Sequence, residues 1–343
     1  MRDERQRDIS RLIKNDERVL WNFYNLYNPK VIRDDDPVYP YKMLLFGENT
    51  KEESGYDKTY LARSKDLQSW EVYTKDGGWD TEMKPERWQP VVSKGEKKFD
   101  NCHAGDPAVV YQDHRYYLAY SSVGFDERLK GDKKQFYIVN CIMGAISDDL
   151  IHWTKSEEPI LIWDKEYELG WEIEQPKPHN HGGYHRPSLI FDEGKWKLWF
   201  DYYLDGTFLS MGYAENQGDF LDASDYRLLK YGDDPVLRDF PNPSVIKIDD
   251  DYFAFADPPS FDEKRTTNRR TVIAHSKDGI NFHVLGHLLP DPDEGAHVAE
   301  PFYDQDGKLY LFYSRLPDYD WPRYKEIHRV ELDLEELRKL AED

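Results

Sequence analysis

The sequence predicts an all-β protein, a five-bladed β-propeller, from an internal repeat and a second motif in phase with it. Five times a proline follows a residue able to form hydrogen bonds and opens a run of strand-forming residues. The five pairs are Asn28-Pro29, Asp106-Pro107, Arg186-Pro187, Asn242-Pro243 and Glu300-Pro301. The prolines are 78, 80, 56 and 58 residues apart, which suits four-stranded units that differ in loop insertions.

Each proline opens the first strand of a unit, and a polar turn such as Asp192-Glu193-Gly194 leads to a second, aromatic strand. The second strands are expected at 41–46, 116–120, 196–200, 252–255 and 309–313. A small-residue strand then ends in a Ser/Asp turn and an aromatic residue, as in LARSKDLQSW, GAISDDLIHW and IAHSKDGINF, with GYAENQGDF a weaker copy. Two motifs in phase favour a propeller over a sandwich or a barrel.

The two ends of the chain differ from the repeats. Residues 1–20 have apolar positions with helical spacing, which predicts an N-terminal helical extension. Residues 333–343 are expected to form a C-terminal helix capped by Asp333. A strand near residues 21–27 could close the last blade. No Gly/Ser/Pro-rich linker interrupts the chain, so residues 1–343 are predicted to be a single domain.

Charge and cysteine content limit the partners and the compartment. A formal net charge of −21 argues against nucleic acid and anionic membranes. Cys102 and Cys141 cannot form a disulfide framework, and the opening MRDERQRDIS lacks the apolar core of a secretion signal. No stretch is apolar enough to span a bilayer. We therefore expect a cytoplasmic protein whose terminal extensions serve in accessory packing or in a homo-oligomer.

The residues before the prolines are predicted to converge around the propeller axis, in a central pocket. HAGDP (103–107) and HVAEP (297–301) stand out, because they carry Asp106 and Glu300. Two carboxylates facing one pocket suit glycoside hydrolysis, in which one protonates the leaving oxygen and the other activates water or attacks the sugar. The alternative is that both acids bond strand-end backbone groups. The candidate substrate-binding residues are Asn28, His103, His181, His185, Arg186, Asn242 and His297.

Other acidic and histidine residues receive lesser roles. Asp201 and Asp257 end second strands and are expected to form inter-blade hydrogen bonds. Glu172 and Glu174 lie in an insertion that could fold over the pocket. The histidine-rich segment 179–185 matches no strong zinc signature, and no glycine-rich phosphate loop is present. No cofactor is predicted, with a central calcium ion held mostly through waters as the alternative.

Together, the inner-strand motifs and the Ser/Asp turns resemble the five-bladed propeller glycoside hydrolases of families 43, 32, 117 and 130, over nearly the whole chain. Similarity to family 43 implies an inverting enzyme with an Asp base, a second Asp that tunes the acid, and a Glu acid. Asp106 then matches the base and Glu300 the acid. Asn28-Pro29 departs from this pattern, because family 43 usually has its Asp base in the first blade.

Asn-Pro in a first blade also resembles family 130, which includes cytoplasmic phosphorylases that cleave mannosides with inorganic phosphate. We expect hydrolysis of a short oligosaccharide or glycoside from its non-reducing end, because insertions 75–102 and 122–140 would wall off a pocket. The tryptophans in or near insertions, which are candidate stacking platforms, are Trp79, Trp88, Trp163 and Trp171. A phosphorylase and a non-catalytic carbohydrate-binding propeller are the alternatives, since one fold hosts many functions.

Overall fold

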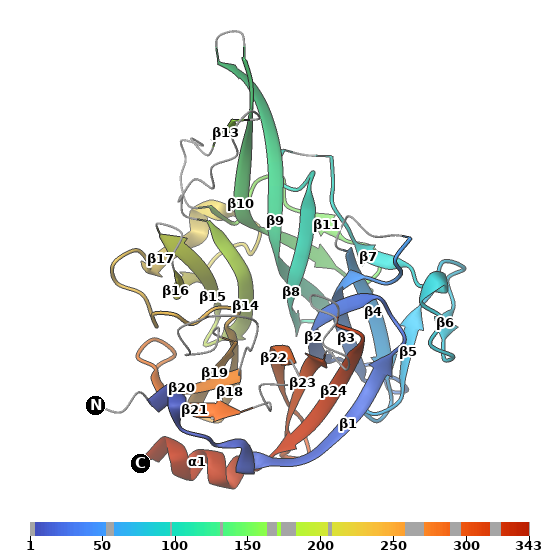
Figure 1. Ribbon diagram of the computed structural model, residues 1–343, viewed down its shortest axis with the longest axis vertical. Coiled ribbons are helices and arrows are strands. Elements are labelled where there is room, and N and C mark those ends of the chain that lie inside the picture. The colour runs from blue at the N-terminus through green and yellow to red at the C-terminus, as the bar shows by residue number, and fades with distance from the viewer. Residues whose placement is uncertain are drawn as a thin grey trace. The chain divides into compact units, whose positions relative to one another are not determined.

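The computed structural model describes residues 4–52, 58–96, 98–130, 133–162, 170–172, 183–204, 208–257, 271–288, 296–315 and 324–342. These residues form five antiparallel sheets and one α-helix (Figure 1). Each sheet begins with one of the predicted inner strands and is one blade. The protein is a five-bladed β-propeller, as the repeat predicts.

The chain divides into two compact units. The N/C unit comprises Met1–Gly55, Tyr60–Pro90 and Asn242–Asp343, and the middle unit comprises Tyr56–Thr59 and Val91–Pro241. We describe each unit by itself.

Three blades belong to the N/C unit. The first runs in the order β2 (Asn25–Arg33), β3 (Tyr41–Glu48), β4 (Lys58–Ser64), β5 (Trp70–Tyr73) and β6 (Trp79–Asp80), followed in the chain by η3 (Pro85–Arg87) and β7 (Pro90–Val92). The fourth has the order β18 (Ser244–Ile248), β19 (Asp251–Ala256), β20 (Thr271–Ser276) and β21 (His283–Leu288). The fifth has the order β22 (Ala296–Tyr303), β23 (Leu309–Arg315), β24 (Glu326–Leu332) and β1 (Ile13–Trp21).

Two blades belong to the middle unit. The second runs in the order β8 (His103–Gln112), β9 (Arg115–Lys130), β10 (Lys133–Ser147) and β11 (Thr154–Lys155), with β12 (Leu161–Ile162) and β13 (Gly170–Glu172) also paired to β10. The third has the order β14 (Tyr184–Asp192), β15 (Lys195–Leu204), β16 (Phe208–Asn216) and β17 (Tyr226–Lys230), with η4 (Ala223–Asp225) before its last strand.

The predicted N-terminal helical extension is wrong for most of its length. Two short 3₁₀ turns, η1 (Glu4–Gln6) and η2 (Ser10–Leu12), precede β1, which pairs with β24 and completes the fifth blade. The register shifts between Arg18 and Leu20, and Val19 and Leu20 are both buried. This irregularity breaks the alternation of a strand and imitates helical spacing. The closing strand is therefore β1, rather than one at residues 21–27.

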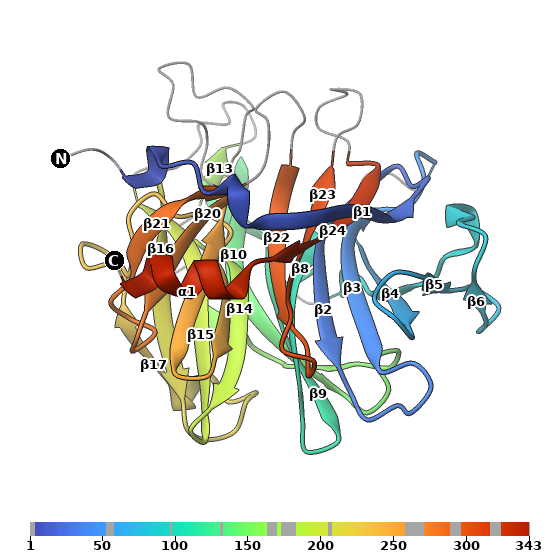
Figure 2. The same cartoon turned by 90° about the horizontal axis from the view of Figure 1, so that it is seen from below.

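The predicted C-terminal helix and its cap are confirmed. Helix α1 (Leu334–Glu342) begins after Asp333, whose Oδ1 accepts a hydrogen bond of 3.1 Å from the backbone N of Glu336. The backbone N of Asp333 donates to the carbonyl oxygen of Leu12 at 2.8 Å. Figure 2 shows α1 continuing from β24 beside the N-terminal turns.

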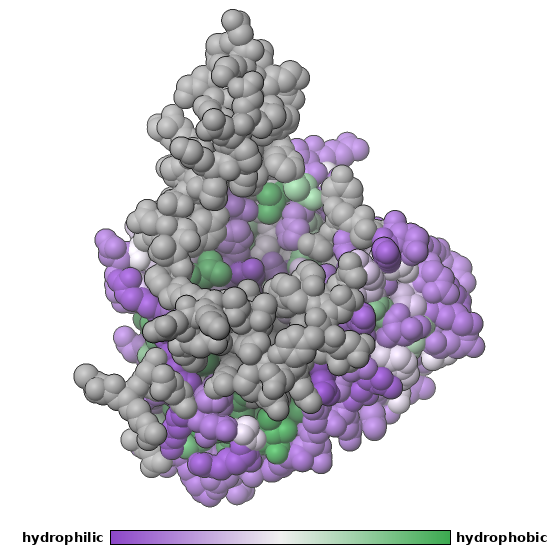
Figure 3. Space-filling model, in the orientation of Figure 1, coloured by the Kyte–Doolittle hydropathy of each residue, from purple (hydrophilic) through white to green (hydrophobic). Residues whose placement is uncertain are grey.

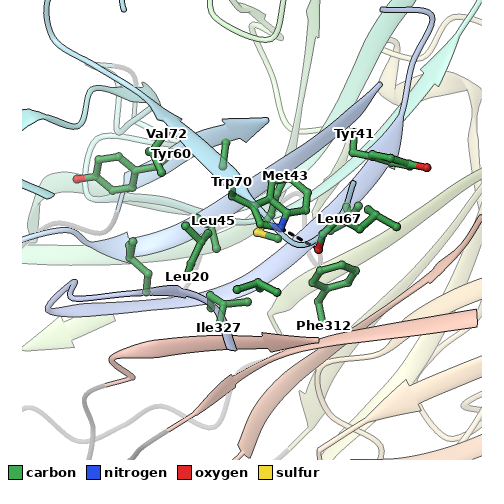
Figure 4. Packing of buried hydrophobic residues seen from close by; sticks show 14 of the residues in the cluster. Leu20, Tyr41, Met43, Leu45, Tyr60, Leu67, Trp70, Val72, Phe312 and Ile327 are labelled. Atoms are coloured by element: carbon green, nitrogen blue, oxygen red, sulfur yellow. Dashed lines mark hydrogen bonds between the residues drawn. The ribbon is translucent and has the colours of Figure 1, made fainter. Parts of the chain in front are cut away.

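Large side chains fill the blades. In the N/C unit one cluster joins residues of β1, β22, β23 and β24, all in the fifth blade, with residues of the first blade (Figure 4). The indole of Trp70 packs edge-on against Phe312 and donates to the carbonyl oxygen of Leu67 at 3.1 Å. Trp70 ends the first predicted Ser/Asp turn, so this motif anchors the outer part of a blade to the core.

The Ser/Asp turns form as predicted. In the turn after β4, Ser64 Oγ accepts from the backbone N of Asp66 and of Leu67, and Asp66 Oδ1 accepts from those of Gln68 and Ser69. The same pattern recurs at Ser147–Asp149 and Ser276–Asp278. These side chains satisfy backbone groups that the strand no longer pairs.

On the face shown in Figure 3 the described residues are largely hydrophilic. Among these residues, no helix is long and apolar enough to cross a membrane. Cys102 and Cys141 are both free thiols.

Candidate active site

Every blade has one non-glycine residue with a left-handed backbone where its inner strand begins. These residues are Asn28 (φ 53°), Asp106 (47°), Arg186 (46°), Asn242 (53°) and Val298 (45°). In four of the blades the register shifts at this residue, so that two consecutive residues have no partner across the hairpin. Asn and Asp tolerate this conformation, whereas Arg and above all Val are strained in it. Such strain concentrates at functional sites.

The fifth blade departs from the proline repeat. Its left-handed residue is Val298, and Glu300 is the first residue paired after the shift, opposite Phe312. Glu300 therefore matches Lys30, opposite Leu44, and not Asn28. The prediction that Asp106 and Glu300 hold equivalent positions at their strand starts is wrong by two residues, because the fifth blade has its proline two residues later.

In the N/C unit Glu300 is held by two donors. Its Oε2 accepts from Nζ of Lys30 at 3.1 Å and from Oγ of Ser244 at 2.5 Å. The side chains of Lys30 and Glu300 are 9% and 8% exposed. A buried charge is stable only when paired, and Lys30 supplies the partner of the Glu300 carboxylate. Lys30 was missed from the sequence, although a lysine in a predicted inner strand is itself a signal that a buried acid lies nearby.

The middle unit brings two of the other predicted residues, Arg186 and His103, close to Asp106. Burial raises the pKa of the Asp106 carboxyl above its ordinary value, and nearby Asp201 adds to this. The positive charge of Arg186, the neighbouring His103 and a hydrogen bond with Ser121 act in the opposite direction. Because burial prevails, the protonated form of Asp106 is favoured.

Arg186 and its neighbours are also fixed. The backbone N of Arg186 donates to Oγ of Ser121 at 2.6 Å, and its Nη1 lies 2.9 Å from Oδ2 of Asp201. The side chain of Arg186 is 31% exposed while that of Asp201 is fully buried. Burial lowers the pKa of His185 to about 4. His185 therefore stays neutral near pH 7.

Asp201 and Asp257, which were expected to form inter-blade hydrogen bonds, each bond a residue at the start of their own blade. Asp201 lies opposite His185 and bonds Arg186 of its own blade. Asp257 accepts from Nδ2 of Asn242, also in its own blade. Antiparallel pairing returns the end of a second strand to the start of the first, which brings these carboxyl groups to the inner-strand residues.

Asn28 presents a polar atom with no partner. Its side chain is buried, and within the described ranges no hydrogen bond reaches Oδ1. A buried acceptor of this kind requires explanation, and a ligand hydroxyl is one.

Several residues predicted for the site or its insertions lie outside the part of the chain that the structure describes. His181, Trp163 and Glu174 fall outside the described residues, and only the backbone of His297, Trp171 and Glu172 is described.

Trp88 is fully buried and bonds Asp80, so it is no stacking platform, and Trp79 stacks on Arg63. Among the described residues no group of three or more His, Cys, Asp or Glu side chains is placed to hold a metal ion.

Solved structures match this architecture. A family 117 glycoside hydrolase of Zobellia galactanivorans aligns with a TM-score of 0.62 and 17% identity, over 95% of this chain and 92% of that one. The chain has the fold of the five-bladed propeller glycoside hydrolases. A thermostable family 43 glycoside hydrolase aligns with a TM-score of 0.52 and 13% identity, over 91% of this chain and 90% of that one.

The same fold also occurs in an enzyme of different chemistry. An N-acetylgalactosamine deacetylase from F. plautii aligns with a TM-score of 0.61 and 16% identity, over 96% of this chain and 97% of that one. No family model and no curated protein matches the sequence. At these identities the likeness establishes the fold, and activity has to be argued from the residues.

Proposed function

We propose that this protein is a glycoside hydrolase that uses Asp106 and Glu300 on a short oligosaccharide or glycoside. The environment of Asp106 carries the proposal. A carboxyl whose protonated form is favoured by burial, on an inner-strand residue beside Arg186 and His103, is suited to donate a proton. The shared fold with glycoside hydrolases supports the same reaction class.

The local charges favour roles opposite to those implied by the resemblance to family 43. Asp106, with its raised pKa, would protonate the leaving glycosidic oxygen. Glu300, ion-paired with Lys30, would remove a proton from the attacking water. The C–O bond to the leaving group breaks as a bond from water oxygen to the sugar carbon forms, which inverts the anomeric centre. We propose further that the enzyme acts from the non-reducing end.

Three other predicted residues would bind the sugar. Arg186 can donate hydrogen bonds to substrate oxygens through its partly exposed side chain. Oδ1 of Asn28 would accept from a hydroxyl, and Asn242 stands at the equivalent point of the fourth blade.

The test compares D106N and E300Q on a panel of nitrophenyl glycosides and on oligosaccharides of the same sugar. A general acid matters most when the leaving group is poor, so D106N should lose about 10²- to 10⁴-fold on oligosaccharides and less on nitrophenyl glycosides. E300Q should lose similar amounts on both. D100N is the control, because Asp100 is an equally buried carboxyl of the middle unit, ion-paired with Lys155. Equal activity of D106N and D100N on every substrate would refute the proposal.

Two alternatives are tested with the same panel. Phosphate-dependent release of a sugar phosphate would show the phosphorylase that the Asn-Pro motif suggests. Acetate release from N-acetyl sugars would show a deacetylase, which the similarity to the F. plautii enzyme favours as second candidate. Binding of sugars with no turnover would indicate a non-catalytic propeller.

A further inference from the structure

Lys30 is a buried cation in an inner strand. It is the first paired residue after the register shift in β2, and its Nζ is 3.1 Å from Oε2 of Glu300 in β22. Leu44 and Val31, its cross-strand partner and its neighbour in sequence, are buried and apolar. A buried lysine at this position loses the hydration of its charge, and only a partner of opposite charge can compensate for that loss.

Glu300 is constrained from both sides. Lys30 approaches from β2 and Ser244 from β18, and both strands pack against β22. Both bonds end on Oε2. Two donors on one oxygen stop the carboxylate from rotating and leave Oε1 as the atom that can accept a proton.

We propose that Lys30 is a positioning residue, which compensates the buried charge of Glu300 and directs Oε1 to the water that attacks the sugar. This inference rests on the proposed function, in which Glu300 is the base. A purely structural pair, which merely joins β2 to β22, would stabilise the blades without affecting the chemical step.

The chain offers a matched control in Lys42. Its Nζ lies 2.7 Å from Oδ2 of Asp34, and the two side chains are 10% and 3% exposed. Lys42 belongs to β3 of the same blade, and its described bonds go to Asp34, Asp36 and Tyr39. K42M therefore removes an equally buried ion pair that does not involve Glu300.

The first experiment needs no substrate. Infrared difference spectra of ¹³C-glutamate-labelled protein at neutral pH should show a protonated carboxyl band in K30M that is absent from K42M and from K30M/E300Q. The Tm of K30M should fall by roughly 10 °C, and the double variant should recover at least half of this, because an uncompensated buried charge is no longer present. A K30M spectrum identical to wild type would overturn the proposal. If K30M does not fold, K30Q replaces it, since its amide brings no charge.

The second experiment measures kcat and KM on a nitrophenyl glycoside that the wild type hydrolyses. We expect K30M to lower kcat about as much as E300Q, with little effect on KM and no further loss in K30M/E300Q, whereas K30R retains most of the activity. Full kcat in K30M with loss in E300Q would overturn the role of Lys30 and leave the hydrolase intact. Full kcat in E300Q would instead refute Glu300 as the base, whatever the infrared result.

Discussion

Glu300 and Lys30 occupy the same register position in two blades whose inner strands pack together, and their side chains form a buried ion pair. The same position holds Ala108, Ser188 and Ser244 in the other blades, so charge at this position is confined to the pair. Any substitution of one partner therefore also changes the environment of the other.

Asp106→Asn should stabilise the protein at neutral pH while removing activity. A raised folded pKa means that the folded state binds the proton more tightly, so the contribution of Asp106 to stability is present at low pH and is lost as pH rises through that pKa. The asparagine side chain does not ionise, so the variant does not lose this contribution to stability as the pH rises. Urea unfolding should show the variant more stable than the wild type at pH 7, with the gain shrinking as the pH falls towards the ordinary pKa of aspartate. A destabilised variant at pH 7 would show that Arg186 outweighs burial.

His185 should make stability fall as the solution becomes acidic. Burial lowers its pKa to about 4, so the unfolded state binds the proton more tightly between pH 6.5 and pH 4. Its contribution is fully present above the unfolded pKa and is lost through this window. H185Q should flatten the dependence of unfolding free energy on pH there by about 2 to 3 kcal/mol. An unchanged slope in H185Q would count against the burial of this ring.

Gly47 should tolerate no side chain. Its φ is +130°, and a Cβ atom would lie 2.2 Å from the carbonyl oxygen of Asn25 in the paired strand. Gly47→Ala should cost about 3 kcal/mol or more. Gly77 has φ +79° and open space around it, so Gly77→Ala isolates the backbone effect and should cost about 1 kcal/mol. Equal losses measured by chemical unfolding would contradict the steric argument.

The closing strand offers two adjacent residues with opposite environments. Leu20 is fully buried, whereas Trp21 is 39% exposed with the guanidinium of Arg18 4.9 Å from its ring centroid. Leu20→Ala should cost about 2 to 5 kcal/mol and Trp21→Ala about 1 kcal/mol or less. Thermal unfolding of both variants measures the difference. Similar Tm values would contradict the position of β1 in the fifth blade.

The five blades could be predicted because their cause is local. A proline leaves its own nitrogen without a hydrogen, and Asn28, Asp106 and Asn242 accept the left-handed backbone before it. The Ser/Asp turns are equally local, since Ser64 and Asp66 satisfy their own neighbours.

The wrong predictions concern features that depend on contacts between distant parts of the chain. Val298 adopts a left-handed backbone, which no sequence rule would assign to a β-branched residue. The two-residue offset of Glu300 from the position equivalent to Asp106 could therefore not be predicted. The strand β1 owes its existence to β24, more than 300 residues later, and local spacing alone suggested a helix.

This pairing of β1 with β24 also sets an order of events during synthesis. Strand β1 leaves the ribosome more than 300 residues before β24, so it must wait for β24 before either edge is satisfied, while the blades between them can form from neighbouring hairpins. Until then the apolar side of β1 needs protection from other nascent chains. The fifth blade should therefore stay incomplete while the residues between β1 and β24 are translated, and a ribosome stalled in this interval should yield a polypeptide that engages chaperones.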